Sequence, residues 1–555
     1  MKSDRLFLLA LLGFTVLPKT AFSAINTASQ SDISMGNAEV SVFSADKTDR
    51  SQPTSKTGPK PTDSPSAAGQ PASATPQPKQ QIASTQLPTG VAKGTTPPQY
   101  LNWRPRQSLG AVASQRRDEL SGKSTWEEKQ PWSLHRILGL PDWVSLTLEE
   151  RVRYEDYDTP WIKGNTQGQH SLPIQTVLWG EARFSDTFRM GAEFWDARQW
   201  GSSHPNRLTT AMVNTGQFAQ IYAAWINRDL FGLGVDSETK AGQMTMDIGS
   251  RRLIARAAFR NVQYQYVGMQ NRLREKNGDW ELVTFANVPM RMLPDNNNIH
   301  ALKENEVIWN RPQTDTVLTG FLFNRKLSWQ SQAELYTYYL HEGPINPLKR
   351  NLWTPGARFY RNSLKGEFDW ELETIGQTGS ARLKEMAKTK DIGAVMQHAH
   401  IGYTFDSPWT PRFLIQWDYA SSHFDTLFSP TVFEYGPTGI LGLFNRNNIN
   451  SPGYRLFVAP HPDLLIYIAN RFWWLADPRS TTGWSTAKLV DPTGKAGSYL
   501  GQSWELNARW DAHENVAFQA GWQVLQKGGF AMNAPGAPKD HGNVNYFFVQ
   551  TELRF

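Results

Sequence analysis

The last ten residues of the chain restrict its fold more than any other segment. They read YFFVQTELRF, with Phe547, Val549, Thr551, Leu553 and Phe555 alternating with Phe548, Gln550, Glu552 and Arg554. Successive side chains of a strand point to opposite faces, so one face is apolar and aromatic and the other is mostly polar. On a soluble protein such a terminal strand would be an aggregation hazard. In an outer-membrane barrel the apolar face meets lipid and the polar face meets the lumen, and the segment predicts that fold.

The amino terminus predicts export from the cytoplasm. Lys2 and Arg5 precede an apolar run from Leu6 to Leu17, and the small residues Ala21 and Ser23 follow. A basic start, a short apolar core and small residues two apart are typical of a secretory signal peptide, which we expect at residues 1–23. The apolar run is too short to cross a bilayer core of about 30 Å as a helix.

The composition favours a membrane barrel. The mean hydropathy is −0.51, yet the chain has 22 Trp, 17 Tyr and 28 Phe. Alternating strands with girdles of aromatic residues combine a polar average with many aromatic side chains. No segment after the signal peptide approaches 18 uninterrupted apolar residues, so no transmembrane helix is expected. The chain has no cysteine, which excludes disulfide bonds and thiolate metal sites.

The segment after the predicted signal peptide differs from the rest of the chain. Residues 24–125 are rich in Ser, Thr, Gln, Ala and Pro, with ten prolines between Pro53 and Pro98. Such a composition buries too little apolar surface to offset the entropy lost on ordering, so we expect a disordered periplasmic segment. It would act either as a tether that reaches a partner or as a spacer. Residues 126–143 are expected to form a short helix or turn before the barrel.

Residues 144–555 are expected to form antiparallel strands separated by turns, and the chain is therefore all-β. Apolar and polar residues alternate in several segments, among them 146–155, 329–339, 412–422, 504–510 and 516–524. A soluble sandwich would not need a Trp-rich face opposite the polar one this often. A segment of this length suits a transmembrane barrel of about 16 to 18 strands around an aqueous lumen.

The predicted barrel has no net charge. The chain carries 57 basic and 51 acidic residues. Residues 1–140 hold 16 of the basic and 10 of the acidic residues, which leaves 41 of each in residues 141–555. Anion selectivity would therefore have to arise from how the charges are divided between lumen and loops.

Four motifs occur in a fixed order over residues 138–555. They are LGLPDWVSLTLEERVRYEDYD at 138–158, KAGQMTMDIGSRRLI at 240–254, LFNRNNINSPGYRLFVAP at 443–460 and DPTGKAGSYLGQSWELNARW at 491–510. Together with the terminal strand they resemble the alginate export domain of proteobacterial outer-membrane proteins, whose first strand has the form R-x-R-Y-E after an LPDW-type turn. The resemblance implies an 18-stranded barrel with an arginine-rich lumen through which a polyuronate leaves the cell.

One position departs from this resemblance. The family's strand usually reads G-R-Q, whereas this chain has Gly242, Gln243 and Met244. A guanidinium there would face the lumen and bind a carboxylate with two hydrogen bonds, but a glutamine offers only a neutral amide. Arg251 or Arg252 nearby are alternative sources of the charge. Alginate itself is therefore not assumed to be the substrate.

Arginines on the polar faces of the strands are the predicted substrate-binding residues of the pore. Strand parity directs six of them inward, namely Arg151, Arg153, Arg183, Arg189, Arg412 and Arg509. The first two also lie in the motif that resembles the family's first strand. Weak, repeated binding of carboxylates to such residues would let a polyanion enter and leave. The alternative is that the arginines pair with acids such as Glu149, Glu181, Glu193, Asp418 and Glu505 and brace the wall.

Other polar-face residues have less specific interpretations. Tyr336 and Tyr338 either stack on sugar rings or pack within the barrel. His398 and His400 share a strand face at a spacing that can ligate a metal, but no third ligand is identifiable in the sequence. We expect histidines satisfied within the lumen, with no metal and no other cofactor.

A hydrolase has only loose support. His461 lies near Asp463, and Ser422 precedes His423, but no G-x-S-x-G motif, P-loop or dinucleotide fingerprint occurs. We therefore predict that the protein is not an enzyme and has no catalytic residue.

The sequence predicts a channel in the outer membrane for passive export of an anionic exopolysaccharide, such as an alginate-like polyuronate. The alternatives are a porin that takes up small acidic solutes, an outer-membrane hydrolase and a structural anchor. The predicted partners are the anionic polysaccharide, outer-membrane lipid and periplasmic export proteins, and no nucleic acid is expected. A final strand that ends in Phe also resembles the signal that the barrel-assembly machinery recognises.

Overall fold

Antiparallel strands make up most of the chain between Val144 and Arg554. The computed structural model describes residues 132–256, 259–383, 387–429 and 442–555. The predicted signal peptide, the segment 24–125 and the first part of 126–143 lie outside these residues. In the described part of the chain, no helix is both long and apolar enough to cross a membrane.

Nineteen strands occur in the described residues. They are β1 (Val144–Tyr157), β2 (Gln169–Arg183), β3 (Phe188–Trp200), β4 (Asn214–Asn227), β5 (Val235–Met244), β6 (Tyr266–Glu275), β7 (Trp280–Arg291), β8 (Arg311–Pro312), β9 (Thr316–Lys326), β10 (Ser331–Glu342), β11 (Asn351–Arg361), β12 (Glu367–Arg382), β13 (Thr389–Thr404), β14 (Arg412–Ala420), β15 (Ile449–His461), β16 (Leu464–Trp474), β17 (Tyr499–His513), β18 (Val516–Lys527) and β19 (Val544–Arg554).

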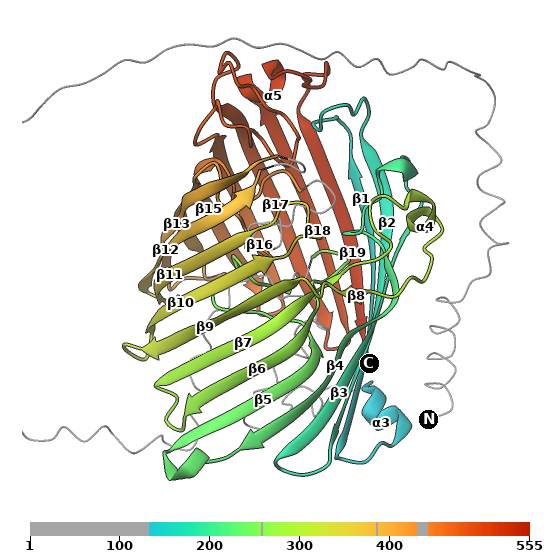
Figure 1. Ribbon diagram of the computed structural model, residues 1–555, viewed down its shortest axis with the longest axis vertical. Coiled ribbons are helices and arrows are strands. Elements are labelled where there is room, and N and C mark those ends of the chain that lie inside the picture. Colours follow the sequence, from blue (N-terminus) through green and yellow to red (C-terminus); the bar gives the residue numbers. More distant parts are fainter. Residues whose placement is uncertain (1–131, 257–258, 384–386, 430–441) are drawn as a thin grey trace, which may run out of the picture. The chain divides into compact units, whose positions relative to one another are not determined.

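Each strand pairs with its neighbours along the chain, except at β8. This two-residue strand lies beside β7, and β9 pairs directly with β7. The wall closes because β19 pairs with β1, from Glu149 opposite Arg554 to Tyr157 opposite Tyr546 (Figure 1). Without β8, 18 of the 19 strands form a closed antiparallel barrel, which confirms the predicted fold class and strand number. Closure leaves no free edge in the wall that these 18 strands form.

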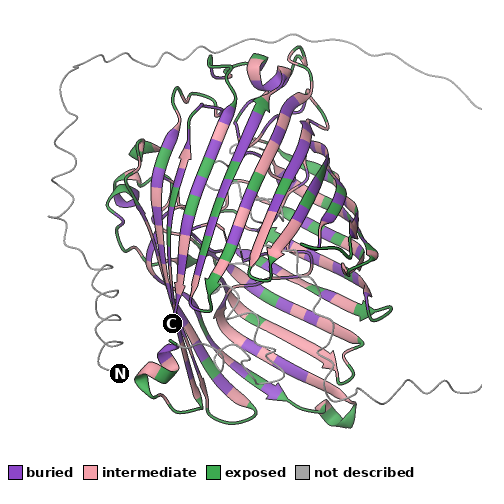
Figure 2. Cartoon of the chain, turned by 180° about the vertical axis from the view of Figure 1, so that it is seen from behind, coloured by how far each residue is buried: buried purple, intermediate pink, exposed green. Residues whose placement is uncertain are grey.

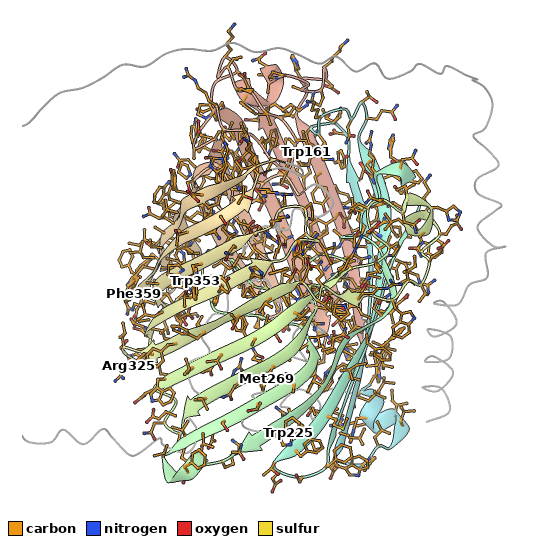
Figure 3. The ribbon with its side chains drawn as sticks, viewed as in Figure 1. Trp161, Trp225, Met269, Arg325, Trp353 and Phe359 are labelled. Atoms are coloured by element: carbon orange, nitrogen blue, oxygen red, sulfur yellow. The ribbon has the colours of Figure 1, made fainter. Side chains whose placement is uncertain are left out.

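Side chains alternate between the two faces of the wall. In β1, Arg151 and Arg153 are buried, whereas Val152 and Tyr154 are 39% and 40% exposed. Figure 2 shows this alternation as bands of buried and exposed residues along the strands. The exposed face carries large apolar side chains around the wall, and Figure 3 labels Trp225, Met269, Trp353 and Phe359 among them. An apolar outer face and a polar inner face match a barrel with lipid outside and water inside.

The connections between strands are short at one end of the barrel and longer at the other. The short-turn end consists of 184–187, 228–234, 276–279, 327–330, 362–366, 405–411, 462–463 and 514–515. The long-loop end consists of 158–168, 201–213, 245–265, 292–315, 343–350, 383–388, 421–448, 475–498 and 528–543. In outer-membrane barrels the short turns lie on the periplasmic side and the longer loops on the outer side.

Short helices lie outside the wall strands. Helix α3 (Leu134–Leu138) precedes β1 within the segment 126–143; the backbone N–H of Arg136 donates to Ser133 Oγ at 3.3 Å, and Gly139 ends the helix in a left-handed conformation. Trp132 stacks on His513 at the turn between β17 and β18, with ring centroids 5.0 Å apart. The other helical elements lie in connections, and they are α4 (Ile299–Lys303), α5 (Gly529–Asn533), η2 (Pro205–Arg207) and η3 (Leu230–Gly232).

Candidate functional site

The connection between β5 and β6 folds into the lumen. We call residues 245–265 the in-folded segment; residues 257–258 within it lie outside the described part. Its first half binds the inner face of β12, where Ser250 Oγ donates to Glu373 Oε1 at 2.9 Å and Arg252 Nη1 donates to Glu371 Oε1 at 2.6 Å. Arg252 also pairs with Glu373. Ion pairs of this kind fix the segment to the wall because they leave no charge unpaired in a buried position.

The second half of the in-folded segment binds a different part of the wall. Arg256 forms a bidentate ion pair with Glu193 of β3, with nitrogen–oxygen distances of 2.7 and 3.1 Å. Arg151 of β1 donates to Asn261 Oδ1 at 3.1 Å, and the indole N–H of Trp195 donates to the Asn261 carbonyl at 3.1 Å. Because β3 and β12 lie nearly opposite in the strand order of the closed wall, the segment crosses the lumen.

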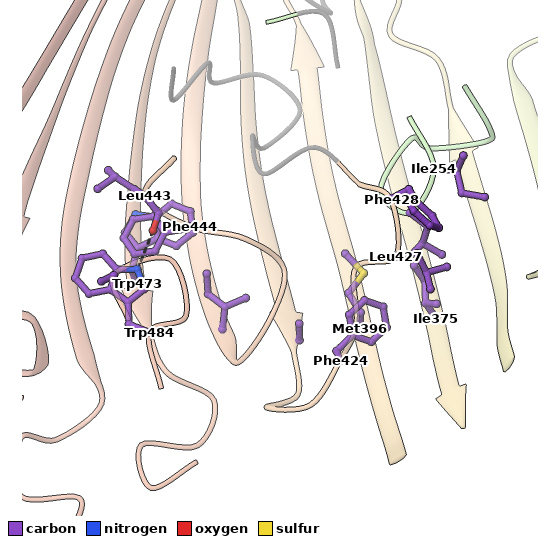
Figure 4. Close-up of a cluster of buried hydrophobic side chains, with 14 of the residues drawn as sticks. Ile254, Ile375, Met396, Phe424, Leu427, Phe428, Leu443, Phe444, Trp473 and Trp484 are labelled. Atoms are coloured by element: carbon purple, nitrogen blue, oxygen red, sulfur yellow. Dashed lines mark hydrogen bonds between the residues drawn. The ribbon is translucent and has the colours of Figure 1, made fainter. Parts of the chain in front are cut away.

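Two other long connections contribute an apolar cluster inside the barrel. Phe444 of the connection 421–448 stacks on Trp473 of β16 with ring centroids 3.9 Å apart (Figure 4). The ring of Trp484, on the connection 475–498, lies 5.3 Å from that of Phe444. The backbone N–H of Phe428 donates to the Leu253 carbonyl of the in-folded segment at 2.9 Å. Leu253 and Ile254 of the in-folded segment belong to the same buried apolar cluster, so apolar burial also supports the segment.

A cavity of about 410 Å³ lies on one side of the in-folded segment and reaches the β6–β7 turn; we call it the short-turn cavity. The in-folded segment contributes 247–249 to its lining. Its charged lining residues are Arg272, Arg274 and Lys326 on the basic side and Asp247, Glu281 and Glu334 on the acidic side. Arg274 Nη2 lies 2.7 Å from Glu281 Oε2, so part of this charge is neutralised locally. Three cations and three carboxylates leave this cavity without net charge.

A second cavity, of about 530 Å³, is lined by residues of the long connections 158–168, 201–213 and 475–498; we call it the long-loop cavity. The in-folded segment contributes 259–261 to its lining, so the same segment lies between the two cavities. The charged lining residues are Arg153, Arg207, Arg260 and Lys488 against a single acid, Glu155. Four cations and one carboxylate give this cavity a net charge of +3.

Of the six predicted arginines, only Arg153 lines either of these two cavities. Its Nη1 lies 2.9 Å from Glu155 Oε1, and its guanidinium stacks 3.6 Å above the Phe259 ring. Arg151 is buried and holds the in-folded segment instead. The role of these arginines in substrate binding stays a prediction.

The other four predicted arginines form ion pairs on the wall. Arg189 Nη2 lies 2.8 Å from Glu238, Arg412 Nε lies 2.9 Å from Asp369, and Arg509 Nη2 lies 2.8 Å from Glu552. Arg183 is 28% exposed and lies 3.6 Å from Glu181. This is the bracing arrangement that the sequence left open as an alternative.

The position at which the chain departs from the family motif makes local hydrogen bonds. The side-chain amide of Gln243 donates to the Phe218 carbonyl and to Gln265 Oε1, the latter at 3.1 Å. Arg251 lies 2.5 Å from Asp247, and Arg252 pairs with the acids of β12 described above. Arg251 and Arg252, the two arginines that could supply the positive charge absent at Gln243, are thus both in ion pairs.

Tyr336 and Tyr338 pack within the barrel. Their rings stack on each other with centroids 5.0 Å apart, and the Tyr336 hydroxyl donates to Glu373 Oε1 at 2.6 Å. Both side chains are buried, so the packing alternative describes them better than sugar stacking does.

Sequence reasoning missed Arg207, Arg260 and Lys488. All three lie on connections, where no strand parity indicates the direction of a side chain. Arg207 Nη1 donates to the Gln167 carbonyl at 2.9 Å, and Arg260 lies 5.7 Å from the Tyr264 ring. No signal in the sequence distinguishes them from ordinary loop cations.

Comparisons with known proteins identify the family of the chain. A model of the alginate export family matches residues 142–545. Among solved structures, the outer membrane protein OprD from Pseudomonas aeruginosa is 12% identical, with 75% of this chain and 94% of that chain covered and a TM-score of 0.47. OccAB4 from Acinetobacter baumannii is 10% identical, with 74% and 98% covered and a TM-score of 0.48. No match is found among curated proteins.

The family match extends over nearly the whole of the 18-stranded wall, from the residue before Trp143 to the start of β19. It includes both attachment sites of the in-folded segment and the residues that line the two cavities. The family and the closed barrel support an outer-membrane channel. The chain belongs to the alginate export family of outer-membrane proteins.

Proposed function

We propose that the protein is a channel for the passive export of an anionic polysaccharide with carboxylate groups, such as a polyuronate. The observation that carries the proposal is the charge of the long-loop cavity, with four cations and one carboxylate in its lining. A cavity lined by one sign of charge raises the local concentration of ions of the opposite sign. Carboxylates along a polymer would be attracted there although the barrel segment as a whole has no net charge.

The chemistry of this cavity suits an acidic sugar chain. Arginine forks bind carboxylates with two parallel hydrogen bonds, and Arg207 and Arg260 are both partly exposed in the lining. Trp161 also lines the cavity, and its indole N–H has no hydrogen-bond partner among the described residues. A buried indole N–H usually finds such a partner, and a sugar hydroxyl is a suitable acceptor.

The cations are arranged for weak binding rather than for one tight site. Arg153 shares its charge with Glu155, and the exposed Lys488 lies on a connection. Conduction requires binding that is favourable enough for entry but weak enough for release. The remaining predicted arginines, Arg151, Arg183, Arg189, Arg412 and Arg509, are proposed to add to the field of the lumen while they brace its wall.

The proposal includes partners that the export of a polymer requires. The polymer would arrive at the short-turn end, which faces the periplasm in barrels of this kind. Periplasmic export proteins are proposed to deliver it there, with the segment 24–125 as their contact. The barrel-assembly machinery is proposed to recognise β19, whose outer face carries the exposed Phe547 and Val549.

The proposal is tested with the purified full-length protein in a planar bilayer. We expect a reversal potential that indicates anion selectivity under a KCl gradient, and block of the current by an oligouronate. Changing Arg207, Arg260 and Lys488 together to Gln should remove most of the selectivity and weaken the block. Arg325→Gln is the matched control, because Arg325 is exposed on β9 and lines neither cavity. A cation-selective channel that an oligouronate does not block would contradict the proposal.

A second candidate is a porin for small acidic solutes, which the short-turn cavity favours. Its three cations and three acids would pass a small monocarboxylate without concentrating a polyanion. One experiment distinguishes the two candidates. A porin conducts a monocarboxylate, and its current is not blocked by an oligouronate at the same total concentration of carboxylate groups. Deletion of the gene separates them in cells, because loss of secreted polymer indicates export and slower growth on an organic acid indicates uptake.

A further inference from the structure

Two histidines on the inner face of β13 face each other through their ring nitrogens. His398 Nε2 lies 3.1 Å from His400 Nδ1. His398 is opposite Asp418 of β14 and Glu373 of β12 in the strand register, and His400 is opposite Glu371 of β12. The register therefore places carboxylates from both neighbouring strands around the two imidazoles.

The outer nitrogen of each ring faces a carboxylate. His398 Nδ1 lies 2.9 Å from Asp418 Oδ1, and His400 Nε2 lies 3.5 Å from Asp369 Oδ1. An ionised carboxylate only accepts hydrogen bonds, so the outer nitrogens carry the N–H groups and the facing nitrogens of neutral rings carry lone pairs. Two lone pairs directed at each other across 3.1 Å repel unless a proton or a cation lies between them.

The carboxylates that hold the rings are themselves fixed. Arg471 Nη2 donates to Asp418 Oδ2 at 2.6 Å, and Arg412 Nε donates to Asp369 Oδ2 at 2.9 Å. Metal-ligating histidines commonly donate their second ring N–H to a carboxylate, which sets the tautomer and the orientation of the ring. His398 has that arrangement, and His400 Nε2 lies 3.5 Å from a carboxylate in the corresponding position, while His398 Nε2 and His400 Nδ1 face each other.

We propose that His398, His400 and Glu371 form a binding site for a divalent first-row transition ion, with Zn²⁺ as the best match. Zn–N bonds of about 2.0–2.1 Å place two ligand nitrogens roughly 3.0–3.4 Å apart at angles of about 95–110°. The observed 3.1 Å lies in this range. Ligand atoms of the three residues all lie within 4.8 Å of one another. Imidazole nitrogens with one carboxylate suit zinc, whereas calcium and magnesium prefer oxygen ligands alone.

Glu371 supplies the third ligand from the neighbouring strand. Arg252 and Arg358 donate to its two oxygens at 2.6 to 3.0 Å, so the carboxylate is held beside the rings. An ionised carboxylate has about four lone-pair sites, and these contacts leave room for a metal bond after a small shift. The fourth coordination position would be taken by water, as in open zinc sites.

The charges around the site are balanced before an ion binds. The surrounding carboxylates are Asp369, Glu371, Glu373 and Asp418, and the guanidiniums bound to them are Arg252, Arg358, Arg412 and Arg471. A divalent ion between the rings is thus not repelled by an uncompensated positive cluster. The side chain of His400 is 6% exposed and that of His398 is 1% exposed, so the ion would enter on the His400 side.

The test uses the purified, untagged full-length protein in detergent, with Zn²⁺ as the probe. Competition with a chromophoric chelator should give one zinc ion per chain, and His398→Gln or His400→Gln should abolish that binding. His461→Gln is the control and should leave binding unchanged, because His461 is exposed at the end of β15. Asp418 contacts the proposed ligands through His398, so Asp418→Asn should weaken zinc binding by about 10- to 100-fold without changing the stoichiometry.

Folding of each variant is checked through the shift in gel mobility on heating that closed barrels give. If a histidine variant does not fold, Cu²⁺ bound to the unmodified protein provides a second measurement, because its electron paramagnetic resonance spectrum should show coupling to two imidazole nitrogens. The proposal fails if the unmodified protein binds no zinc. It also fails if folded His398→Gln and His400→Gln both bind zinc like the unmodified protein, or if Cu²⁺ shows no imidazole coupling.

Discussion

The two cavities of the lumen differ in charge although one segment lines both. The short-turn cavity has three cations and three acids, whereas the long-loop cavity has four cations and one acid. The charges of the short-turn cavity come mainly from the strands β6, β7, β9 and β10. Three of the four cations of the long-loop cavity come from connections. The charges of the short-turn cavity are balanced in number, whereas those of the long-loop cavity are not, and we propose that its loop cations bind a ligand.

This difference has a structural reason. An ionised group on the inner face of a strand is held at a fixed place in the wall, and burial there is costly unless a partner of opposite charge is present. A cation on a connection remains partly hydrated and needs no such partner. Unbalanced positive charge therefore lies on the connections, where no local pattern in the sequence indicates the direction of a side chain.

The largest effect is expected when the in-folded segment, which lies between the two cavities, is detached from the wall. Arg256→Ala leaves Glu193 buried without its bidentate partner, which costs about 3–5 kcal/mol for a broken buried pair. We expect the in-folded segment to leave the β3 wall, the cavities to merge and the single-channel conductance to rise. Arg325→Ala serves as the control on the outer face. An unchanged conductance in folded Arg256→Ala would mean that the segment does not obstruct the lumen.

The next test compares block of the current by an oligouronate added on either side of the bilayer. An oligouronate should block the current more strongly from the long-loop side than from the short-turn side, because only the long-loop cavity has a net positive charge. The block should weaken between 0.1 M and 1 M salt, since the Debye length falls from about 10 Å to about 3 Å. Equal block from both sides at low salt would contradict the charge asymmetry. Recordings with the barrel inserted in one known orientation provide the measurement.

A smaller effect is expected from changing the balanced cavity. Glu281→Gln would leave Arg272 and Arg274 without the acid that lies 3.4 and 2.7 Å from them, and would give the short-turn cavity a net charge of +1. The reversal potential should shift toward stronger anion selectivity. Asp186→Asn, an exposed change in the β2–β3 turn, is the control. A reversal potential equal to that of the control would show that this cavity does not contribute to selectivity.

The smallest effect is expected at Arg183. Its side chain is 28% exposed and its Nε lies 3.6 Å from Glu181, which is too long for a hydrogen bond, so the pair is weak. Exposed pairs contribute about 0–1 kcal/mol, and Arg183→Gln should change neither the thermal unfolding midpoint nor the selectivity appreciably. Arg189→Gln provides the contrast. It should lower the thermal unfolding midpoint clearly, because Arg189 is buried against Glu238. Equal shifts of the unfolding midpoint in Arg183→Gln and Arg189→Gln would contradict the difference in burial between the two arginines.

The barrel fold could be predicted from the sequence because the alternation of apolar and polar residues is a local pattern within each strand. Alternation along β1 and β19 indicates both faces of a strand without knowledge of its neighbours, and the family motifs supply the strand number. The same parity found inner-face arginines such as Arg153. It did not identify the ion-pair partners of Arg189 and Arg412, since Glu238 and Asp369 are far away in the sequence.

The parts that escaped prediction depend on long-range geometry. The in-folded segment is held by Glu193 and Glu373, which lie on strands far apart in the sequence. Glu371 was not recognised as a neighbour of His400 because only the register between β12 and β13 brings the two together. Arg207 and Lys488 lie on loops whose paths no local pattern encodes.

The attachment of the in-folded segment also sets an order of events during biogenesis. Its two anchors, Glu193 on β3 and Glu373 on β12, acquire their final separation only after the strands between them have paired on both sides of the wall. Docking of the segment must then come late in maturation. A newly inserted molecule would then have a wider lumen until the segment docks, and it would be more permeable to bulky solutes during that interval.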